Sequence, residues 1–380
     1  MPFPLTNEQE MVRLMVEQFT RREVAPGAAA RDRESRFPVE IVEQMGALGL
    51  LGMMVPAAYG GSDVGAVAYA LAVMELARGC GSAAVTMSVS NLACEPLMQS
   101  EDEEQKKRLL TPLAGGLMLG AIALTEPGAG SNLAEIACRA RKKGSRYLIN
   151  GSKVFITNGG YAGLTIVLCR TGEGRGLTVF AVEKDAPGLT IGPPVHKMGL
   201  LASNTVELIF EDCEVPEENR IGKEGDGLRI IGRALEGGRV GIAAQSTGMM
   251  AACLDEAIKY AQERKQFGKA LTAHQAVQFM IAEIGASLEA ARLLTLSAAS
   301  LKGQGKPFAR EASIAKMFAS EALNESAAKA LQIHGGYGYT REFPIERIYR
   351  DARVTTIYEG TNQVQRMIIA RELLKGSGEG

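Results

Sequence analysis

The chain has 380 residues, of which 46% are hydrophobic and 22% charged, a composition typical of folded proteins and unlike that of disordered ones. Its 42 lysines and arginines nearly balance 43 aspartates and glutamates, so no overall charge favours binding to nucleic acid or to an anionic membrane. At about 150 residues per domain, the length predicts two to three domains.

Cysteine and histidine spacing excludes several kinds of site. The six cysteines lie at least 14 residues apart without a C-x-x-C pair, which favours buried thiols in a reducing compartment. The three histidines are too scattered for a metal site, so no metal is expected. Without a long apolar run or a leader pattern, we expect a soluble cytoplasmic protein, or a mitochondrial matrix protein if a transit peptide has been removed.

Helical patterns fill the first third of the chain. Thr6 and Gln9 form a predicted capping box, and apolar residues recur behind it at the three- and four-residue spacing of a buried helix face. Further helical patterns follow at 38–48 and 66–78. We therefore predict an N-terminal helical domain over residues 1–116.

Strand patterns replace the helical ones in the middle of the chain. The dipeptide Asn150-Gly151 lies between two β-prone runs and is the pair that most favours a type I′ turn, which predicts a hairpin at this point. More β-prone runs lie at 164–169 and 177–182. Short strands without intervening long helices predict an antiparallel β-barrel or sandwich over residues 117–228.

Helical periodicity then returns and continues almost to the end. Thr272 and Gln275 form a second predicted capping box, and an apolar stripe continues from it to Leu294. Helices of this length predict a C-terminal four-helix bundle over residues 229–380. The fold class is therefore α+β, with helical, β and helical domains in that order.

Common catalytic motifs are absent from the sequence. It contains no G-x-S-x-G and no G-x-x-x-x-G-K-[ST], and Gly128-Ala129-Gly130 lacks the third glycine of the dinucleotide fingerprint. These absences exclude the familiar serine hydrolase, P-loop and Rossmann patterns.

Five polar or glycine-rich segments remain, at 124–132, 155–160, 264–275, 332–339 and 357–363. Each alone is explained by a turn, a strand end or a helix cap. Together, in this order on an α–β–α frame, they resemble the acyl-CoA dehydrogenase family of flavoenzymes along essentially the whole chain. The resemblance implies the three-domain fold of that family, FAD as cofactor and a role in fatty acid β-oxidation.

The family's reaction gives the residues their implied roles. A base removes the α-proton of an acyl-CoA thioester while the β-hydrogen leaves as hydride to flavin N5, giving the trans-2-enoyl-CoA. Glu359, in the matching Tyr-Glu-Gly-Thr motif, would be the base, and we expect burial to raise its pKa. Some relatives carry their glutamate directly before the arginine that is Arg239 here, but Gly238 occupies that position. Segment 235–239 is most similar to short-chain, butyryl-CoA-type members.

By the same resemblance, the FAD-binding residues would be Leu124, Thr125, Gly130, Ser131, Phe155, Ile156, Thr157, Arg264, Gln266, Phe267, His274, Gln275, Gln332, Gly335, Gly336, Thr361 and Gln363. The substrate-binding residues would be Ser131, Glu236, Arg239 and Gly360. Asn132 replaces the family's usual aspartate, and Phe155 stands where many members carry tryptophan. Several FAD contacts in the family reach a neighbouring subunit, which implies a homotetramer built as a dimer of dimers. Electron-transferring flavoprotein would be the electron acceptor.

The acyl group is less constrained by the sequence. No lysine or arginine lies between residues 79 and 105, which disfavours glutaryl-CoA and other dicarboxylic substrates. Met87, Ser90, Asn91 and Glu95 suggest a shallow pocket for short, branched or cyclic acyl groups. Two alternatives stay open: an acyl-CoA oxidase that passes electrons to O₂, and a catalytically silent helical scaffold or binding protein.

Overall fold

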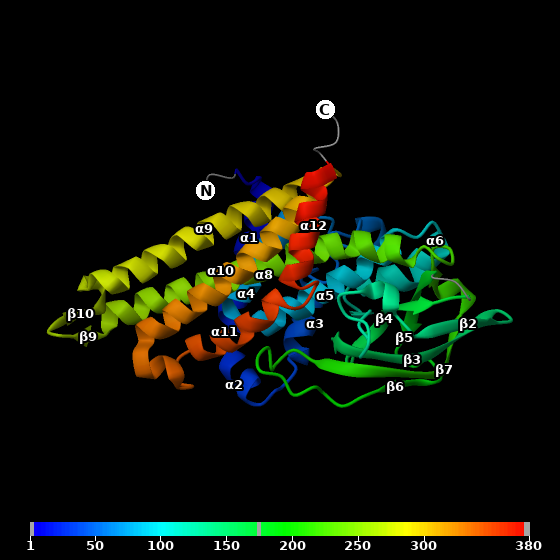
Figure 1. Cartoon of the computed structure of the whole chain (residues 1–380), viewed down its shortest axis with the longest axis horizontal. Helices are drawn as coiled ribbons and strands as arrows, with labels where there is room; N and C mark the ends of the chain where they lie inside the picture. The colour runs from blue at the N-terminus through cyan, green and yellow to red at the C-terminus, as the bar shows by residue number, and fades with distance from the viewer. Residues whose placement is uncertain (1–3, 173–175, 376–380) are drawn as a thin grey trace.

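The computed structural model describes residues 4–172 and 176–375. Figure 1 shows the main sheet at one end of the long axis and a small hairpin at the other, with long helices running between them. N-terminal and C-terminal helices pack against each other along the middle of the molecule, since α4 and α8 are in extensive contact. The sheet is therefore joined to one continuous helical body.

Within the described residues, seven α-helices precede the sheet. They are α1 (Asn7–Phe19), α2 (Ala28–Arg33), α3 (Val39–Ala47), α4 (Gly65–Gly79), α5 (Gly81–Met98), α6 (Glu103–Gln105) and α7 (Thr111–Ala114). The predicted capping box is confirmed at α1, where the Thr6 hydroxyl accepts from the Gln9 N–H and the Gln9 side chain accepts from the Thr6 N–H. Helix α5 is buried along almost its whole length and packs against α8 on one side and β1 on another.

The middle of the chain forms an eight-stranded sheet. Its strands are β1 (Leu119–Ala123), β2 (Arg139–Lys143), β3 (Arg146–Thr157), β4 (Ala162–Arg170), β5 (Leu177–Glu183), β6 (Leu189–Ile191), β7 (Thr205–Pro216) and β8 (Arg220–Ile221). Their order is β6-β7-β3-β2-β4-β5-β8, with β1 paired to β4. Most pairs are antiparallel as predicted, whereas β1 and β2 each pair with β4 in parallel.

The predicted hairpin turn at Asn150-Gly151 is wrong. Strand β3 runs unbroken through both residues, and Gly151, at φ 138°, lies where the register against β7 shifts by a bulge. The Asn150 side chain donates to the Asp212 carboxylate on β7 and accepts from its N–H, each at 2.9 Å. The hairpin between β2 and β3 instead turns at Gly144, at φ 64°.

The C-terminal part contains the longest helices. They are α8 (Gly227–Glu263), α9 (Gln275–Gly303), α10 (Ala309–His334), α11 (Ile345–Ala352) and α12 (Asn362–Lys375), and a small hairpin of β9 (Lys265–Gln266) and β10 (Lys269–Ala270) joins α8 to α9. The predicted Thr272 capping box is wrong, because Thr272 lies in a 3-10 turn and His274 occupies the N-cap without a side-chain cap bond. Helices α8, α9 and α10 pack pairwise, with α4 and α12 beside them.

Glycines let α5 and α8 approach closely. A Cβ atom on Gly238 would lie 3.2 Å from Leu92 of α5, and one on Gly241 would lie 2.7 Å from the Tyr69 hydroxyl of α4. These separations leave no room for a larger side chain on that face of α8. Helices α5 and α8 are thereby tightly packed, and the turn at residues 358–361 lies against them.

No helix within the described ranges is both long enough and apolar enough to cross a membrane. All six cysteines are free and buried. Residues 173–175, between the β-prone runs at 164–169 and 177–182, lie outside the described residues.

Candidate active site

The loop between β1 and β2 is held by a buried ion pair. Lys153 of β3 donates to the Glu126 carboxylate at 2.7 Å and to the Leu124 carbonyl at 3.0 Å, and both charged side chains are almost inaccessible. Glu126 also accepts from the N–H groups of Ala137 and Cys138. These contacts fix both ends of the segment that contains Thr125, Gly130 and Ser131.

The end of β3 lies beside this loop, since the Val154 N–H donates to the Thr125 carbonyl at 2.9 Å. Phe155 follows with its ring 65% exposed and its backbone at φ 60°, a left-handed conformation that non-glycine residues rarely adopt. Ile156 is buried beneath it, and Thr157 is half-buried. The structure therefore brings together the predicted flavin-contact residues of the β region on one surface.

Open space lies in front of the same loop. A Cβ atom on Gly128 or Gly130 would meet no heavy atom within 4 Å. An exposed aromatic ring beside half-buried threonine hydroxyls and an unobstructed glycine loop fits a planar, phosphate-bearing cofactor such as FAD.

Glu359 lies in a strained turn that packs against α8. Its backbone has φ 52°, and a Cβ atom on Gly238 would lie 2.8 Å from its Oε2 atom. This carboxylate oxygen is buried and has no hydrogen-bond partner among the described residues. Burial raises the pKa of the Glu359 carboxyl, while the positive charges of Lys316 and Arg239 lower it. The Oε2 atom of this half-buried side chain is thus an enclosed proton acceptor close to α8.

Polar contacts from two sides fix the turn around Glu359. The Tyr358 hydroxyl donates to the side chain of Gln245 on α8. The Gly360 carbonyl accepts from Lys316 of α10 and from Gln365 of α12, each at 2.9 Å. These anchors hold the strained backbone in place.

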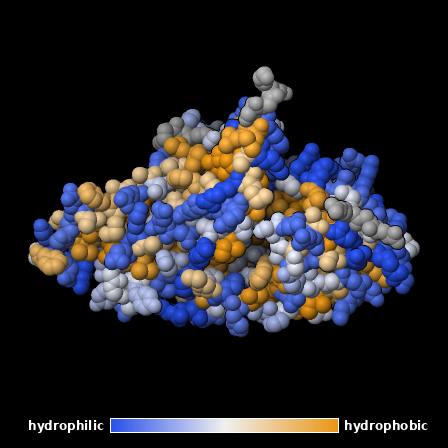
Figure 2. Space-filling view, in the orientation of Figure 1, coloured by the Kyte–Doolittle hydropathy of each residue, from blue (hydrophilic) through white to orange (hydrophobic). Residues whose placement is uncertain are grey.

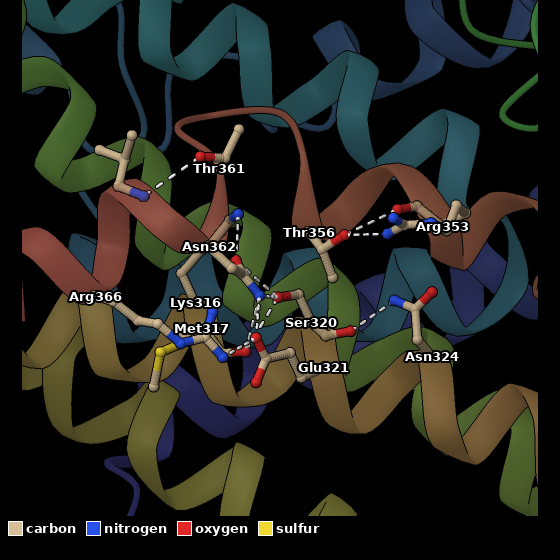
Figure 3. Close-up of polar contacts among 11 residues, drawn as sticks. Lys316, Met317, Ser320, Glu321, Asn324, Arg353, Thr356, Thr361, Asn362 and Arg366 are labelled. Carbon is tan, nitrogen blue, oxygen red and sulfur yellow. Dashed lines mark hydrogen bonds and ion pairs between the residues drawn. The ribbon is translucent and has the colours of Figure 1, made fainter. Parts of the chain in front are cut away.

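Asn362 ties the start of α12 to α10 (Figure 3). Its side-chain oxygen accepts from Lys316 at 2.8 Å, and its amide nitrogen donates to Ser320 at 3.0 Å and to Glu321 at 3.1 Å. The Thr361 hydroxyl accepts from the Val364 N–H in the first turn of α12 at 3.3 Å and so caps this helix. Sequence reasoning missed Lys316, because a lone lysine in a helix pattern is usually exposed.

Two predicted substrate residues lie on α8 near the turn. The Arg239 side chain is partly buried, and its Nε atom has no partner among the described residues. Burial lowers the pKa of this guanidinium, opposed by the charges of Glu236 and Glu359. Burial likewise raises the pKa of Glu236. An unpartnered cation beside an unpartnered carboxylate indicates a site that is completed by a ligand.

The remaining predicted FAD residues form a separate cluster at the hairpin end of the molecule (Figure 1). The Arg264 guanidinium lies over the Tyr337 ring at 5.7 Å, and the Phe267 and His274 rings are 6.0 Å apart. Phe267 is 90% exposed, at φ 53°. Gln266, Gln275, Gln332, Gly335 and Gly336 are also exposed, whereas Thr361 and Gln363 lie at the start of α12, next to Glu359. Within one chain, the structure does not bring the hairpin cluster together with Phe155.

Three family models match successive parts of the chain: the acyl-CoA dehydrogenase N-terminal domain at residues 6–117, the middle domain at 121–213 and the C-terminal domain at 225–374. The chain belongs to the acyl-CoA dehydrogenase family. An acyl-CoA dehydrogenase of Bacillus subtilis strain 168 is 46% identical over 377 residues, which are 98% of this chain and 100% of that relative.

Solved structures agree with this assignment. Butyryl-CoA dehydrogenase from Megasphaera elsdenii superposes with a TM-score of 0.96 at 40% identity, covering 98% of this chain and 100% of its own. A chain described with the electron transferring flavoprotein of Acidaminococcus fermentans has a TM-score of 0.97 at 42% identity, covering 99% and 100%.

Family membership confirms several of the sequence-based expectations. The family consists of FAD-dependent flavoprotein oxidoreductases, and its helical, β and helical domains are those predicted. The chain is therefore an enzyme of the oxidoreductase class, and the alternative of a silent scaffold has no support.

Two polar side chains of α5 bond backbone groups and do not shape the predicted acyl pocket. The polar side chains of Ser90 and Asn91 were expected to shape a shallow acyl pocket, but they bond backbone groups instead. Asn91 accepts from the Met53 N–H at 2.9 Å and donates to the Leu50 carbonyl at 2.8 Å. Their polarity therefore anchors α5 to neighbouring segments and carries no information about the acyl group.

Proposed function

We propose that this chain is an FAD-dependent acyl-CoA dehydrogenase that forms trans-2-enoyl-CoA, with Glu359 as the base. The observation that carries this proposal is the Oε2 atom of Glu359, which is buried, unpartnered among the described residues and held in a strained turn. An enclosed carboxylate without a hydrogen-bond donor is a better proton acceptor than a solvated one. The exposed Phe155 ring and the open glycine loop support a flavin beside it.

The proposed FAD contacts divide into two groups. The loop and strand residues from Leu124 to Ser131 and from Phe155 to Thr157 would hold the flavin of their own chain. The hairpin cluster around Arg264 would reach the FAD of a second copy, because it lies at the far end of the molecule. When bound, FAD supplies the acceptor for the hydride that leaves the substrate β-carbon.

The chain's own residues would move the proton and stabilise the developing charge. The α C–H bond breaks, its proton passes to Glu359, and its electron pair forms the new double bond as hydride leaves the β-carbon. The main-chain N–H of Glu359 has no acceptor among the described residues, so it is available to donate to the thioester oxygen. A donor of this kind contributes about 3 kcal/mol in comparable sites.

We propose short, branched or cyclic acyl-CoA thioesters as substrates. Similarity to butyryl-CoA dehydrogenase supports the short-chain choice. Residues 79–105 contain no lysine or arginine, but Lys302 of α9 lies close to α5 and forms an ion pair with Glu95. Because Glu95 already neutralises that charge, Lys302 offers little to a second carboxylate, and dicarboxylic substrates stay disfavoured.

Electron-transferring flavoprotein is the proposed electron acceptor. The proposed oligomeric state is a homotetramer, and its proposed location is the cytoplasm. Apolar side chains on α12 support association, because Met367 is 71% and Leu374 is 72% exposed. Figure 2 shows hydrophobic residues gathered over this helix. Patches of this kind mark protein interfaces. Light scattering coupled to gel filtration measures the assembly, and a monomeric protein that retains FAD would contradict it.

Glu359→Gln tests the proposed base. The purified variant should stay yellow and bind butyryl-CoA, because glutamine preserves size and polarity, but anaerobic loss of flavin absorbance should slow by about 10³-fold. Glu325→Gln is the matched control, since it makes the same change at an exposed position of α10 and should keep the reaction within a few-fold. Rapid bleaching by Glu359→Gln would move the base elsewhere.

The electron acceptor is tested with the reduced enzyme. After anaerobic reduction by butyryl-CoA, reoxidation should be slow in air and fast with electron-transferring flavoprotein. Rapid peroxide production in air would instead favour the oxidase.

A further inference from the structure

A lysine is buried directly behind the turn that contains Glu359. Lys316 lies on α10 with its side chain inaccessible to solvent, and its ammonium donates to the Gly360 carbonyl and to Asn362 (Figure 3). Burying an ammonium costs several kcal/mol unless charge and hydrogen bonds compensate. The position of Lys316 therefore needs an explanation beyond helix packing.

Hydrogen bonding alone does not require a lysine here. The Gly360 carbonyl also accepts from Gln365, at the same distance of 2.9 Å. The Asn362 oxygen also accepts from Ser320, at 3.3 Å. If the Lys316 ammonium is removed, the Gly360 carbonyl keeps Gln365 as a donor and the Asn362 oxygen keeps Ser320. The distinctive contribution of Lys316 is therefore its positive charge.

The charge of Lys316 is directed toward two carboxylates, and one of them is already paired. Glu321 forms an ion pair with Arg366 at 2.7 Å and accepts from Asn362. Glu359 has no ion-pair partner within 4 Å among the described residues, and its Oε2 atom accepts no hydrogen bond there. Glu359 is therefore the carboxylate whose ionised form depends on the longer-range charge of Lys316.

Other helices also bring ionisable groups toward Glu359. Arg239 approaches from α8 with Glu236 beside it, and the Tyr69 phenol approaches from α4. From α5, Glu95 lies near Tyr69 but is paired with Lys302 of α9. Arg239 is a predicted substrate-binding residue and is only partly buried, whereas Lys316 is fully buried behind the turn.

We propose that Lys316 is a positioning residue that holds the Glu359–Gly360 turn from α10 and keeps the Glu359 carboxylate ionised through its fixed positive charge. The inference rests on the proposed role of Glu359 as base. Burial lowers the pKa of Lys316 to about 8, so Lys316 still carries most of its charge at neutral pH.

Lys316→Met and Gln365→Met form a matched pair, because each removes one donor at 2.9 Å from the Gly360 carbonyl and only the first removes a charge. Both variants should lower the rate of flavin reduction by butyryl-CoA. Only Lys316→Met should move the ionisation midpoint of kcat/KM, upward by about one pH unit, because its Glu359 stays protonated to higher pH. If the methionine variant loses FAD, Lys316→Gln provides the same test.

An infrared titration reads the carboxyl without turnover. The protonated carboxyl band that Glu359→Gln removes should titrate about one unit higher in Lys316→Met than in the wild-type protein. Unchanged midpoints in both measurements, with bleaching still abolished in Glu359→Gln, would overturn the role of Lys316 alone. Normal bleaching in Glu359→Gln would instead overturn the proposed base.

Discussion

Individual residues at the candidate site adopt conformations that cost free energy. Phe155, Phe267 and Glu359 all have positive φ angles, from 52° to 60°. A non-glycine residue in this region costs about 1 kcal/mol or more, so the surrounding contacts must compensate. Strain of this kind concentrates at functional positions, and all three residues were assigned to cofactor or base from their motifs. The motifs predicted which residues matter, but not how their backbones bend.

Gly238→Ala tests how closely the base must be placed. A methyl group 2.8 Å from the Glu359 Oε2 atom would force the carboxylate to shift, while alanine favours the helix by about 1 kcal/mol. The variant should fold and bind FAD, yet reduce its flavin at least about tenfold more slowly. Stopped-flow absorbance measures this rate.

Gly232→Ala on the same helix is the control. A Cβ atom there would meet no heavy atom within 4 Å, so the gain in helix stability should come without a loss of rate. Equal rates for both alanine variants would show that the space at residue 238 does not constrain Glu359.

At the scale of elements, local patterns located strands but not their pairing. Asn150-Gly151 has the residues of a hairpin turn, yet β3 continues through them because its partner β7 lies about 60 residues further along the chain. A bulge and a tight turn favour the same residue types, and only the distant strand decides between them. The parallel contact of β1 with β4 is likewise a property of the assembled sheet.

Lys153→Met tests the ion pair that holds the loop between β1 and β2. Removing the cation leaves Glu126 buried without its charge partner, which should lower the free energy of unfolding by about 3 kcal/mol. FAD affinity should fall with it, because the loop from Thr125 to Ser131 loses an anchor. Urea unfolding and FAD titration measure the two effects.

Lys142→Met is the comparison, since it removes a solvent-exposed ion pair from the adjacent strand. Its unfolding free energy should change by less than about 1 kcal/mol. A similar small loss in Lys153→Met would mean that the buried pair does not stabilise the loop.

At the scale of the whole molecule, three parts of the chain meet at α11. Arg350 pairs with Asp32 from the N-terminal part at 2.6 Å and donates to the Met198 carbonyl before β7. The adjacent Asp351 accepts from the Leu200 N–H. Burial raises the pKa of Asp351 to about 7, so this junction holds a carboxyl that resists ionisation.

Asp351→Asn should make stability less sensitive to pH. Because the folded pKa lies above the unfolded one, Asp351 stabilises the fold at low pH and loses that contribution as pH rises through about 7. Between about pH 4 and 7 this single group lowers the unfolding free energy by about 1.4 kcal/mol per pH unit. Asparagine keeps the bond from Leu200 without that penalty, so the variant should be more stable at pH 8 and similar at pH 4 in urea unfolding. A constant difference across this range would contradict the assignment.

The domain plan could be predicted because hydrophobic periodicity changes where the helices give way to strands. The division of the predicted FAD residues could not, since nothing in the motif at 264–275 shows that it lies at the hairpin end of the molecule, away from the sheet that contains Phe155 (Figure 1). The contribution of Lys316 was also hidden, because 43 residues separate it from Glu359. Motifs thus gave the candidate residues of the site, and the fold determined which of these candidates lie near one another.

The position of Gly238 next to Glu359 bears on which residue can act as the base in related proteins. A side chain at position 238 would enter the space beside the Glu359 carboxylate, although the two residues are 121 positions apart in the sequence. A lineage can therefore transfer its proton acceptor between the turn before α12 and α8 without moving it far in space. A relative that lacks the C-terminal glutamate is not inactive on that ground alone, and the residue before its arginine decides the question.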